Sequence, residues 1–346
     1  MEPAYLMRRT WYMVVHCHEL LFLGRSFFVV KVLVTGGLGF IGSHVVDKLR
    51  EKDIEVRVYD LIHNPELQRE DVEYVAGSIL DLAGLTGAMA DVYAVYHLAA
   101  IADVDEVFED PLYAEQVNVR GTINVLEAAR RTGIRRIVYG NTTWIYSDAD
   151  EVSVDEDTPV HAPSHLYTAT KMAGEYYCRS YYKLYNLPTT VLRYGIPYGP
   201  RARDNLVIPN FVEKALRGDA LTLEGAGLQF RQFVYVDDLA EGNVKALKST
   251  AGYRIFNLDG KEKITIRQIA ETVQKLIGNV QIEYKPGRAG DFSGKEVSSA
   301  RAKRELGWEA TTPLDVGICK YIEWLKSRSE TRKIQEQKAK AIISSL

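Results

Sequence analysis

Tyr167 and Lys171 are the residues whose types and spacing most directly suggest proton transfer. They stand four positions apart at the start of an expected helix, so their side chains share one face. A free tyrosine has a pKa near 10, and a neighbouring ammonium stabilises the phenolate, which makes Tyr167 a usable base near neutral pH. Taken alone, the pair is more often an ordinary exposed contact. What favours catalysis is its place downstream of a nucleotide-binding pattern.

That pattern is the stretch Val32–Gly42, in which an apolar strand leads into Gly36, Gly39 and Gly42 and an amphipathic helix over Phe40–Arg50. Gly36 permits a sharp turn, Gly39 lets a pyrophosphate approach the backbone, and Gly42 lets helix and strand pack closely. The free amides and the helix dipole favour the anion. The stretch therefore predicts a dinucleotide site, with a ligand-free glycine-rich turn as the alternative.

Asp60 indicates which dinucleotide is bound. It ends a second apolar strand, Ile54–Tyr59, about twenty residues beyond the glycines. A carboxylate there binds both ribose hydroxyls and repels a 2′-phosphate, and the next four residues, Leu61 to Asn64, include no Arg or Lys. The sequence therefore predicts NAD rather than NADP, and a positively charged nicotinamide ring would further stabilise the phenolate of Tyr167.

Composition excludes several other classes. The 346 residues include 26% charged residues with a net charge of −3, which is no footprint for nucleic acid. Cys17, Cys178 and Cys319 form no CxxC motif, which favours a reducing cytoplasm. The first thirty residues are too short and polar to span a membrane, and the cluster His16 to His18 has no distant ligand set, so no metal site is expected.

The order of the elements predicts the fold. Strands and helices alternate without repeats, which is typical of a Rossmann-type, doubly wound parallel α/β sheet. Further strands are expected at Val72–Ala76, Val92–His97, Arg136–Tyr139 and Thr189–Tyr194, with helices over Pro111–Arg131, which ends at Gly133, and over Leu166–Tyr185. The predicted divisions are an extension of unknown role (1–30), an NAD-binding domain (31–194, to which 233–258 returns), a smaller α+β substrate domain (195–232 and 259–326) and a charged tail (327–346).

Several motifs together resemble the extended short-chain dehydrogenases/reductases, the family of nucleotide-sugar epimerases and dehydratases. The resemblance covers roughly Lys31 to Leu325 and is closest to UDP-glucose 4-epimerases. Its motifs are Thr35 to Gly42, His97-Leu98-Ala99-Ala100, Asn118 to Thr122, Tyr167 to Lys171, Leu192-Arg193-Tyr194, Tyr198-Gly199-Pro200, Arg231 to Asp238, Arg288 to Asp291 and Glu305 to Trp308.

The resemblance implies roles for individual residues. It makes Tyr167 the catalytic base, Lys171 its partner, and Thr142 the hydroxyl that bonds the reacting group. The implied NAD contacts are Gly36, Gly39, Phe40, Ile41, Gly42, Asp60, Leu61, Ile79, Leu98, Ala99, Ala100, Asn118, Tyr167, Lys171 and Tyr194, and the implied substrate contacts are Asn205, Arg231 and Arg288. Guanidinium groups suit a diphosphate in any case, because their donors pair with two phosphate oxygens.

The chain departs from the family pattern at four places. Trp144 stands in a loop where small residues are usual, Ser78 replaces an Asp near the adenine, Ile196 replaces an Asn that reaches the substrate phosphate, and Gln232 replaces an Asp. The cofactor assignment does not depend on these positions. The identity of the substrate does.

The loop after Thr142 bears on the type of reaction. Family 4,6-dehydratases carry an Asp-Glu pair there and decarboxylases commonly a Glu, whereas this chain has Thr143 and Trp144. A 4-epimerase needs only the tyrosine, the hydroxyl and a retained NAD. The expected activity is therefore 4-epimerisation of a UDP-sugar, either UDP-glucose/UDP-galactose or the N-acetyl forms. The alternatives are an NAD(P)-dependent reductase or dehydrogenase of another nucleotide sugar, and an NAD-binding sensor without catalysis.

Two helices also suggest self-association. Tyr176, Tyr177, Tyr181, Tyr182 and Tyr185 crowd the second of them, more aromatic surface than a helix normally leaves in water. Related enzymes pair such helices in a four-helix bundle. We therefore expect a homodimer through helices 111–131 and 166–185, without nucleic-acid or membrane partners.

Overall fold

The computed structural model describes residues 30–61, 63–249, 252–286 and 294–328. The predictions for the N-terminal extension, including His16 to His18, and for nearly all of the charged tail lie outside these ranges. Among the described residues, no helix is long and apolar enough to cross a bilayer. The same ranges hold no group of three or more His, Cys, Asp or Glu arranged to bind a metal.

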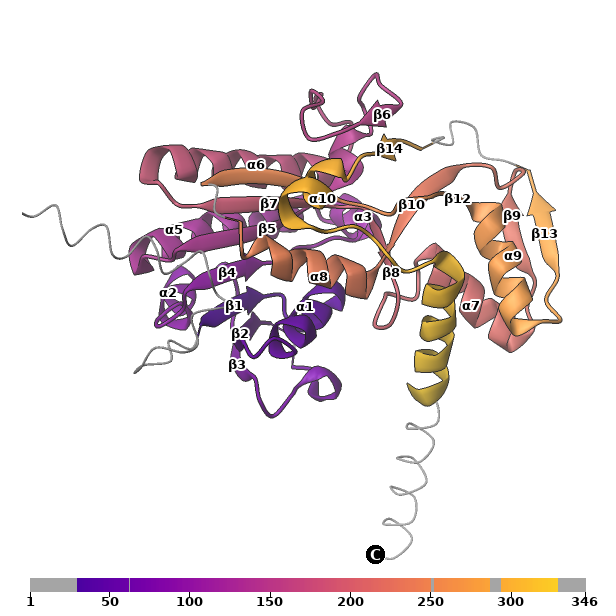
Figure 1. Cartoon of the computed structure of the whole chain (residues 1–346), viewed down its shortest axis with the longest axis horizontal. Helices are drawn as coiled ribbons and strands as arrows, with labels where there is room; N and C mark the ends of the chain where they lie inside the picture. Colours follow the sequence, from indigo (N-terminus) through magenta and orange to yellow (C-terminus); the bar gives the residue numbers. More distant parts are fainter. Residues whose placement is uncertain (1–29, 62, 250–251, 287–293, 329–346) are drawn as a thin grey trace, which may run out of the picture. The chain divides into compact units, whose positions relative to one another are not determined.

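The described residues form a seven-stranded, fully parallel sheet in the order β11-β7-β5-β4-β1-β2-β3 (Figure 1). This confirms the doubly wound prediction. Val32, Leu33 and Val34 of β1 are fully buried, as expected for a central strand covered on both faces. The strands are β1 (Lys31–Thr35), β2 (Glu55–Asp60), β3 (Glu73–Ala76), β4 (Ala94–His97), β5 (Arg136–Thr142), β7 (Thr189–Tyr194) and β11 (Tyr253–Leu258).

Helices cover the sheet in two groups. On one side α1 (Phe40–Arg50) lies against α8 (Val236–Ala246), as Figure 1 shows. The other group consists of α2 (Leu82–Ala88), α5 (Thr122–Thr132) and α6 (Leu166–Tyr185), which pack in that order. The bounds of α1 and α6 are those predicted from the sequence.

The helix predicted over Pro111–Arg131 is interrupted, which corrects the prediction of one uniform α-helix. It consists of α4 (Pro111–Glu115), a π-helical segment η2 (Gln116–Gly121) and α5, which Gly133 ends in a left-handed conformation. A π-turn accommodates one extra residue and often occurs at a functional site. Here it turns Asn118 toward the loop after β4. The side-chain amide of Asn118 accepts a hydrogen bond from the backbone nitrogen of Ile101 and donates one to the carbonyl oxygen of Ile101.

A smaller group of elements packs around its own core. Its strands are β8 (Ile196–Tyr198), β10 (Phe230–Tyr235) and β12 (Lys263–Thr265) in one sheet, and β9 (Leu221–Glu224) and β13 (Ile282–Lys285) in another. Helices α7 (Val207–Arg217), α9 (Ile266–Ile277) and 314–328 cover them. Of the segment 233–258, β11 and α8 join the large sheet and its helices, whereas Phe233 and Tyr235 pack in the smaller core. The domain boundaries themselves stay a prediction.

Short elements connect these parts. They are α3 (Val104–Glu109), the 3-10 turns η1 (Pro65–Leu67) and η3 (Thr143–Tyr146), the paired strands β6 (Ser153–Val154) and β14 (Glu296–Val297), and α10 (Ala300–Leu306).

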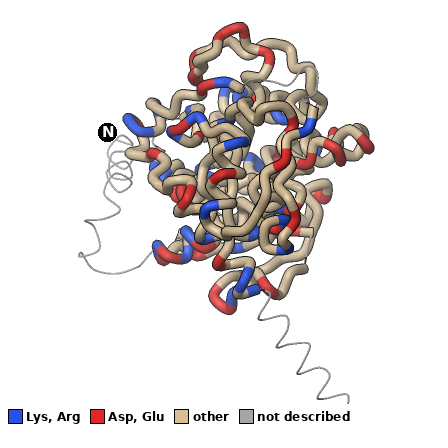
Figure 2. The backbone as a smooth tube through the Cα atoms, turned by 90° about the vertical axis from the view of Figure 1, so that its right-hand side faces the viewer, with Lys and Arg blue, Asp and Glu red and all other residues tan. Residues whose placement is uncertain are grey.

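Charged residues of both signs are mixed over the part of the chain that the structure describes (Figure 2). Many pair locally on the surface, as Lys48 does with Glu51 at 2.8 Å, and such pairs contribute about 0–1 kcal/mol each. One ion pair differs from these because it is buried. Arg193 of β7 donates to both carboxylate oxygens of Glu175 on α6, at 2.5 and 3.1 Å, and Asn141 of β5 donates to the same carboxylate at 2.5 Å.

We expect Glu175→Gln to lower the free energy of unfolding by about 3–5 kcal/mol, because it leaves the buried guanidinium of Arg193 without its counter-charge. Glu51→Gln, which breaks an exposed pair, is the matched control and should change it by less than about 1 kcal/mol. Urea unfolding followed by circular dichroism measures both. Equal effects of the two variants would contradict a special role for the buried pair.

Candidate active site

The glycine-rich turn lies between β1 and α1, where the sheet's central strands end. Gly36 has a φ of +71°, and a Cβ added to it would come within 2.7 Å of the backbone nitrogen of Ala99. A Cβ on Gly42 would overlap the carbonyl oxygen of Gly36. The turn and the end of β4 thus approach so closely that neither glycine can carry a side chain. The residues fit the dinucleotide that the sequence predicts, since a pyrophosphate needs such a bare backbone at a helix N-terminus.

Asp60 lies beside this turn. Its carboxylate oxygen Oδ2 accepts a hydrogen bond from the backbone nitrogen of Leu38 at 2.9 Å. The acidic end of β2 is therefore held at the glycine-rich turn, as ribose recognition requires. Leu61, which follows it, is exposed, and Ile79 is buried beneath Gly121 of η2. The contacts of these residues with NAD stay predictions.

Lys171 contacts the ring of Tyr139 on the neighbouring strand β5. The side chain of Lys171 is buried, with its Nζ 4.5 Å from the centre of the Tyr139 ring, and burial lowers its pKa to about 8. Burial raises the pKa of Tyr167 to about 12, and the charge that opposes this rise is that of Arg203. The effect of Lys171 on the pKa of Tyr167 therefore stays a prediction, and in this structure the ammonium lies over the Tyr139 ring.

Arg203 is therefore a residue that the sequence analysis missed. Its Nη1 lies 2.9 Å from Oδ2 of Asp103, and the amide of Asn205 donates to the same oxygen at 2.8 Å. Asp103 in turn caps the N-terminus of α3. The only available signal was the sequence Arg201-Ala202-Arg203-Asp204-Asn205, which places two arginines after a proline turn. Nothing local in that sequence says that the second one acts on Tyr167.

Thr142 ends β5 and is buried. Its Oγ1 accepts a hydrogen bond from the backbone nitrogen of Trp144 at 3.1 Å, so the residue caps the turn η3 and its hydroxyl proton remains to be donated. Trp144 packs edge-on against His165, with 5.8 Å between ring centres. Since His165 precedes α6, this contact brings the turn after Thr142 beside the start of the helix that carries Tyr167.

Asn118 fixes the first turn of α6. Its Nδ2 donates to Oγ1 of Thr170 at 3.0 Å, and that hydroxyl donates to the carbonyl of Tyr167 at 2.8 Å. Asn118 is 1% exposed, so its side chain positions the helix. The NAD contact predicted for it stays a prediction.

His97 is a second residue to which the sequence analysis gave no role. Its ring is buried between Oγ1 of Thr35 at 2.9 Å and Oγ1 of Thr122 at 3.0 Å. Burial and, to a lesser degree, the charge of Lys171 lower its pKa to about 3. It therefore connects the end of β1 to α5 as a neutral ring.

The other predicted residues are placed as follows. The hydroxyl of Tyr194 donates to Oδ1 of Asn243 on α8 at 2.6 Å, and its contact with nicotinamide stays a prediction. Arg231 donates to the carbonyl of Phe230 at 2.7 Å. Leu98 and Ala100 flank Ala99 at the end of β4, and Phe40 and Ile41 begin α1. Arg288 lies outside the described residues.

The contacts of Gln232 show why an amide suits this position, where the family pattern has an Asp. Its Nε2 donates to the carbonyl of Gly260 at 2.6 Å, while its Oε1 accepts from the backbone nitrogen of Val297 at 2.5 Å. A carboxylate at this position cannot make the donated bond. The amide thus joins β10 to β14 and to the turn after β11.

Comparison with known proteins agrees with this site. The model of the NAD dependent epimerase/dehydratase family matches residues 32–259. The chain is 31% identical over 316 residues to the UDP-glucose 4-epimerase of Mycolicibacterium smegmatis, covering 87% of this chain and all of that one. It is also 31% identical over 311 residues to UDP-glucuronic acid decarboxylase 1 of Danio rerio, covering 87% of this chain and 73% of that one.

Solved structures are similar over the same region. The UDP-glucose 4-epimerase of Thermotoga maritima with UDP-glucose has a TM-score of 0.81 at 30% identity, covering 86% of this chain and 99% of that one. The Thermus thermophilus UDP-glucose 4-epimerase in complex with NAD has a TM-score of 0.75, with the same identity and coverage. With a family match over more than half of its length and a relative matched in full, the protein belongs to the NAD dependent epimerase/dehydratase family.

Proposed function

We propose that the protein epimerises a UDP-sugar at C4, with NAD as a retained cofactor and with UDP-glucose/UDP-galactose or their N-acetyl forms as substrates. The observation that supports this proposal is the turn η3, which follows the buried hydroxyl of Thr142 and packs through Trp144 against His165, the residue before the helix of Tyr167 and Lys171. The turn η3 has Thr143 and Trp144 at the two places where family dehydratases carry an Asp-Glu pair and decarboxylases commonly carry a Glu. Neither residue is an acid. The relatives include a UDP-glucose 4-epimerase and a UDP-glucuronic acid decarboxylase at the same identity, so the residues of this turn are the feature that favours epimerisation.

The chain's own groups suffice for the proton transfers. When bound, NAD supplies a reversible acceptor for hydride. Tyr167 would take the proton of the C4 hydroxyl, and Thr142 would donate a hydrogen bond to the same oxygen. After the 4-keto sugar has turned its other face toward the cofactor, Tyr167 would give the proton back to the oxygen at C4. The cycle is redox-neutral, which distinguishes it from a reductase.

Arg231 and, outside the described residues, Arg288 are the proposed partners of the substrate diphosphate, with Asn205 as a further contact. Asn205 and Arg203 both hold Asp103 beside the site, so these groups are positioned from α3.

We further propose a cytoplasmic homodimer. Leu112 of α4 and Tyr176, Leu184 and Tyr185 of α6 are each more than half exposed, at 51–76%. An apolar surface of this kind on two neighbouring helices favours an interface between copies. Cys178 and Cys319 are free thiols, which suits a reducing compartment.

Tyr167→Phe should lower kcat by about 10²–10⁴-fold, because the ring keeps its packing and loses its proton-transferring oxygen. Conversion of UDP-galactose and of UDP-N-acetylglucosamine, followed by chromatography, measures this. Tyr176→Phe, an exposed phenol on the same helix, is the matched control and should leave kcat unchanged.

The proposal fails if the NAD-loaded wild-type protein leaves both sugars unchanged. A stoichiometric change of absorbance at 340 nm would instead indicate net reduction or oxidation.

Arg203→Gln should move the rising limb of the rate–pH profile to higher pH. The active Tyr167 is the phenolate, so the rate rises as pH passes the pKa of Tyr167, and loss of the guanidinium removes the charge that lowers this pKa. Arg203→Lys keeps a charge and should move the limb less. Identical profiles for the Gln variant and wild type would contradict the assigned influence.

Leu184→Glu should convert the dimer to a monomer, because it places a charge in the proposed apolar interface. Light scattering at micromolar concentration gives the mass of both proteins. Leu228→Glu, also at an exposed leucine but away from these helices, should remain dimeric. A monomeric wild-type protein would contradict the dimer.

A further inference from the structure

The loop 199–206 joins β8 to α7 and carries two groups of the proposed site. Arg203 and Asn205 lie at its far end and hold Asp103. Its near end is fixed to α1, the helix that follows the glycine-rich turn. The positions of Arg203 and Asn205 therefore depend on contacts with α1, about one helical turn or two beyond the glycine-rich turn.

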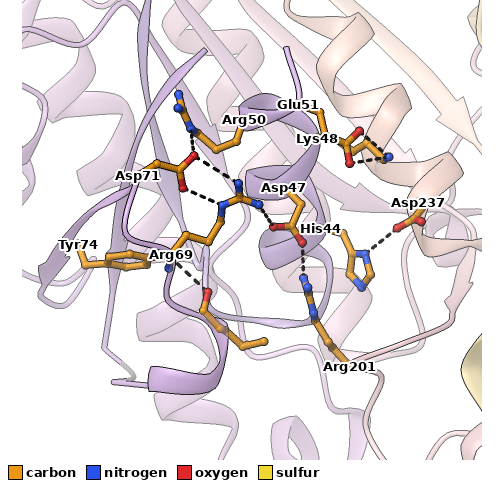
Figure 3. A network of polar contacts seen from close by, with 11 residues as sticks. His44, Asp47, Lys48, Arg50, Glu51, Arg69, Asp71, Tyr74, Arg201 and Asp237 are labelled. Atoms are coloured by element: carbon orange, nitrogen blue, oxygen red, sulfur yellow. Dashed lines mark hydrogen bonds and ion pairs between the residues drawn. The ribbon is translucent and has the colours of Figure 1, made fainter. Parts of the chain in front are cut away.

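Arg201 makes the first of those contacts. Its backbone has a φ of +68°, an unfavourable conformation for a residue with a side chain. Its Nη1 donates to Oδ2 of Asp47 on α1 at 2.7 Å, and the other oxygen of Asp47 accepts from Arg69 at 3.0 Å (Figure 3). The ion pair is thus a contact that opposes the unfavourable backbone conformation at Arg201.

His44 makes the second contact, and both of its ring nitrogens are used. Nδ1 lies 2.7 Å from Oδ1 of Asp237 on α8 (Figure 3). Nε2 lies 2.9 Å from the carbonyl oxygen of Pro200 in the loop. A backbone carbonyl and a carboxylate only accept hydrogen bonds. Both bonds exist together only if both ring nitrogens carry a proton, and that form is the imidazolium.

The surroundings of His44 are compatible with a positive ring. The ring is 6% exposed and packs edge-on against Phe40. The charged residues around it are Asp47 and Lys48 on α1, Arg201 in the loop and Asp237 on α8. The charges of Lys48 and Lys320 also lower the pKa of Asp237. Asp237 is the charge in direct contact, and its hydrogen bond with His44 is the main cause that lowers the pKa of this carboxyl.

We infer that His44 is a positioning residue that, as an imidazolium, joins the loop 199–206 to α1 and α8 and so sets the position of Asn205, the proposed contact of the nucleotide sugar, and of Arg203 beside it. Neutral imidazole has one donor. Above the pH at which the ring loses its second proton, one of the two bonds becomes a contact between two acceptors. The carboxylate attracts the remaining proton more strongly than the carbonyl does, so the bond to Pro200 is the one that breaks.

The consequence for the reaction is specific. The substrate loop loosens as pH rises, while the glycine-rich turn stays as it is. KM for the nucleotide sugar should then rise by about tenfold between pH 6 and pH 9, the effect of one charge-assisted hydrogen bond, with a smaller change in kcat and none in bound NAD. This expectation rests on the proposed function.

The test begins with the ring itself and needs no activity. Nitrogen-detected NMR of the full chain, with NAD bound, identifies the His44 signals by their loss in His44→Gln, and they should show two protonated nitrogens at pH 6. Hydrogen exchange of the peptide 199–206, corrected for intrinsic rates, should increase from pH 6 to pH 9 in wild type. His161→Gln, which replaces an exposed histidine, should behave as wild type.

Kinetics then follow with UDP-galactose. His44→Gln should have a raised KM that no longer changes between pH 6 and pH 9, with NAD content as in wild type. A neutral His44 ring at pH 6, or a His44→Gln variant with wild-type KM and wild-type exchange in the loop, would overturn the inference. If the protein turns over no UDP-sugar, only the proposed function fails, because the ring protonation and loop exchange remain measurable.

Discussion

The buried ion pair between Arg193 and Glu175 is the interaction on which the candidate site depends. It joins β7 to α6, and Asn141 adds β5 through the same carboxylate. Arg193 also donates to the hydroxyl of Tyr146 at the end of η3. Each of these residues stands within a few positions of a residue proposed for catalysis or cofactor binding. The distance between the Thr142 hydroxyl and the helix of Tyr167 is thus fixed by charge in a place where charge without a partner is strongly unfavourable.

The comparison between sequence and structure shows where local information suffices. The helices at Phe40–Arg50 and Leu166–Tyr185 and the strand Thr189–Tyr194 lie where their apolar spacing places them. The glycine roles at Gly36 and Gly42 also follow from spacing, because a turn of this geometry leaves no alternative. By contrast, the π-helical segment around Asn118 depends on the backbone of Ile101, seventeen residues away, and no periodicity within the helix indicates it.

Side-chain direction was the least predictable property of the site. The spacing of Tyr167 and Lys171 places both on one face of α6, yet the aromatic ring of Tyr139 from β5 attracts the ammonium. Arg203, whose charge opposes the rise in the pKa of Tyr167, stands in the loop between β8 and α7. Gln232 is a similar case, since its two backbone partners come from Gly260 and Val297. In each case the decisive partner is distant in sequence.

The π-helical segment has a consequence for how this part of the chain can change. One residue more than an α-helix needs lies between α4 and α5, and each residue of an α-helix turns its successor by about 100°. The π-turn absorbs this residue locally, so Ala114 before it and Leu126 after it both stay in the core. Removing a single position from Gln116–Gly121 would let a regular α-helix form with both flanks still facing the core, but it would remove the turn that directs Asn118 to Ile101 and Thr170. The extra residue therefore serves the contacts of Asn118 rather than the packing of the helix.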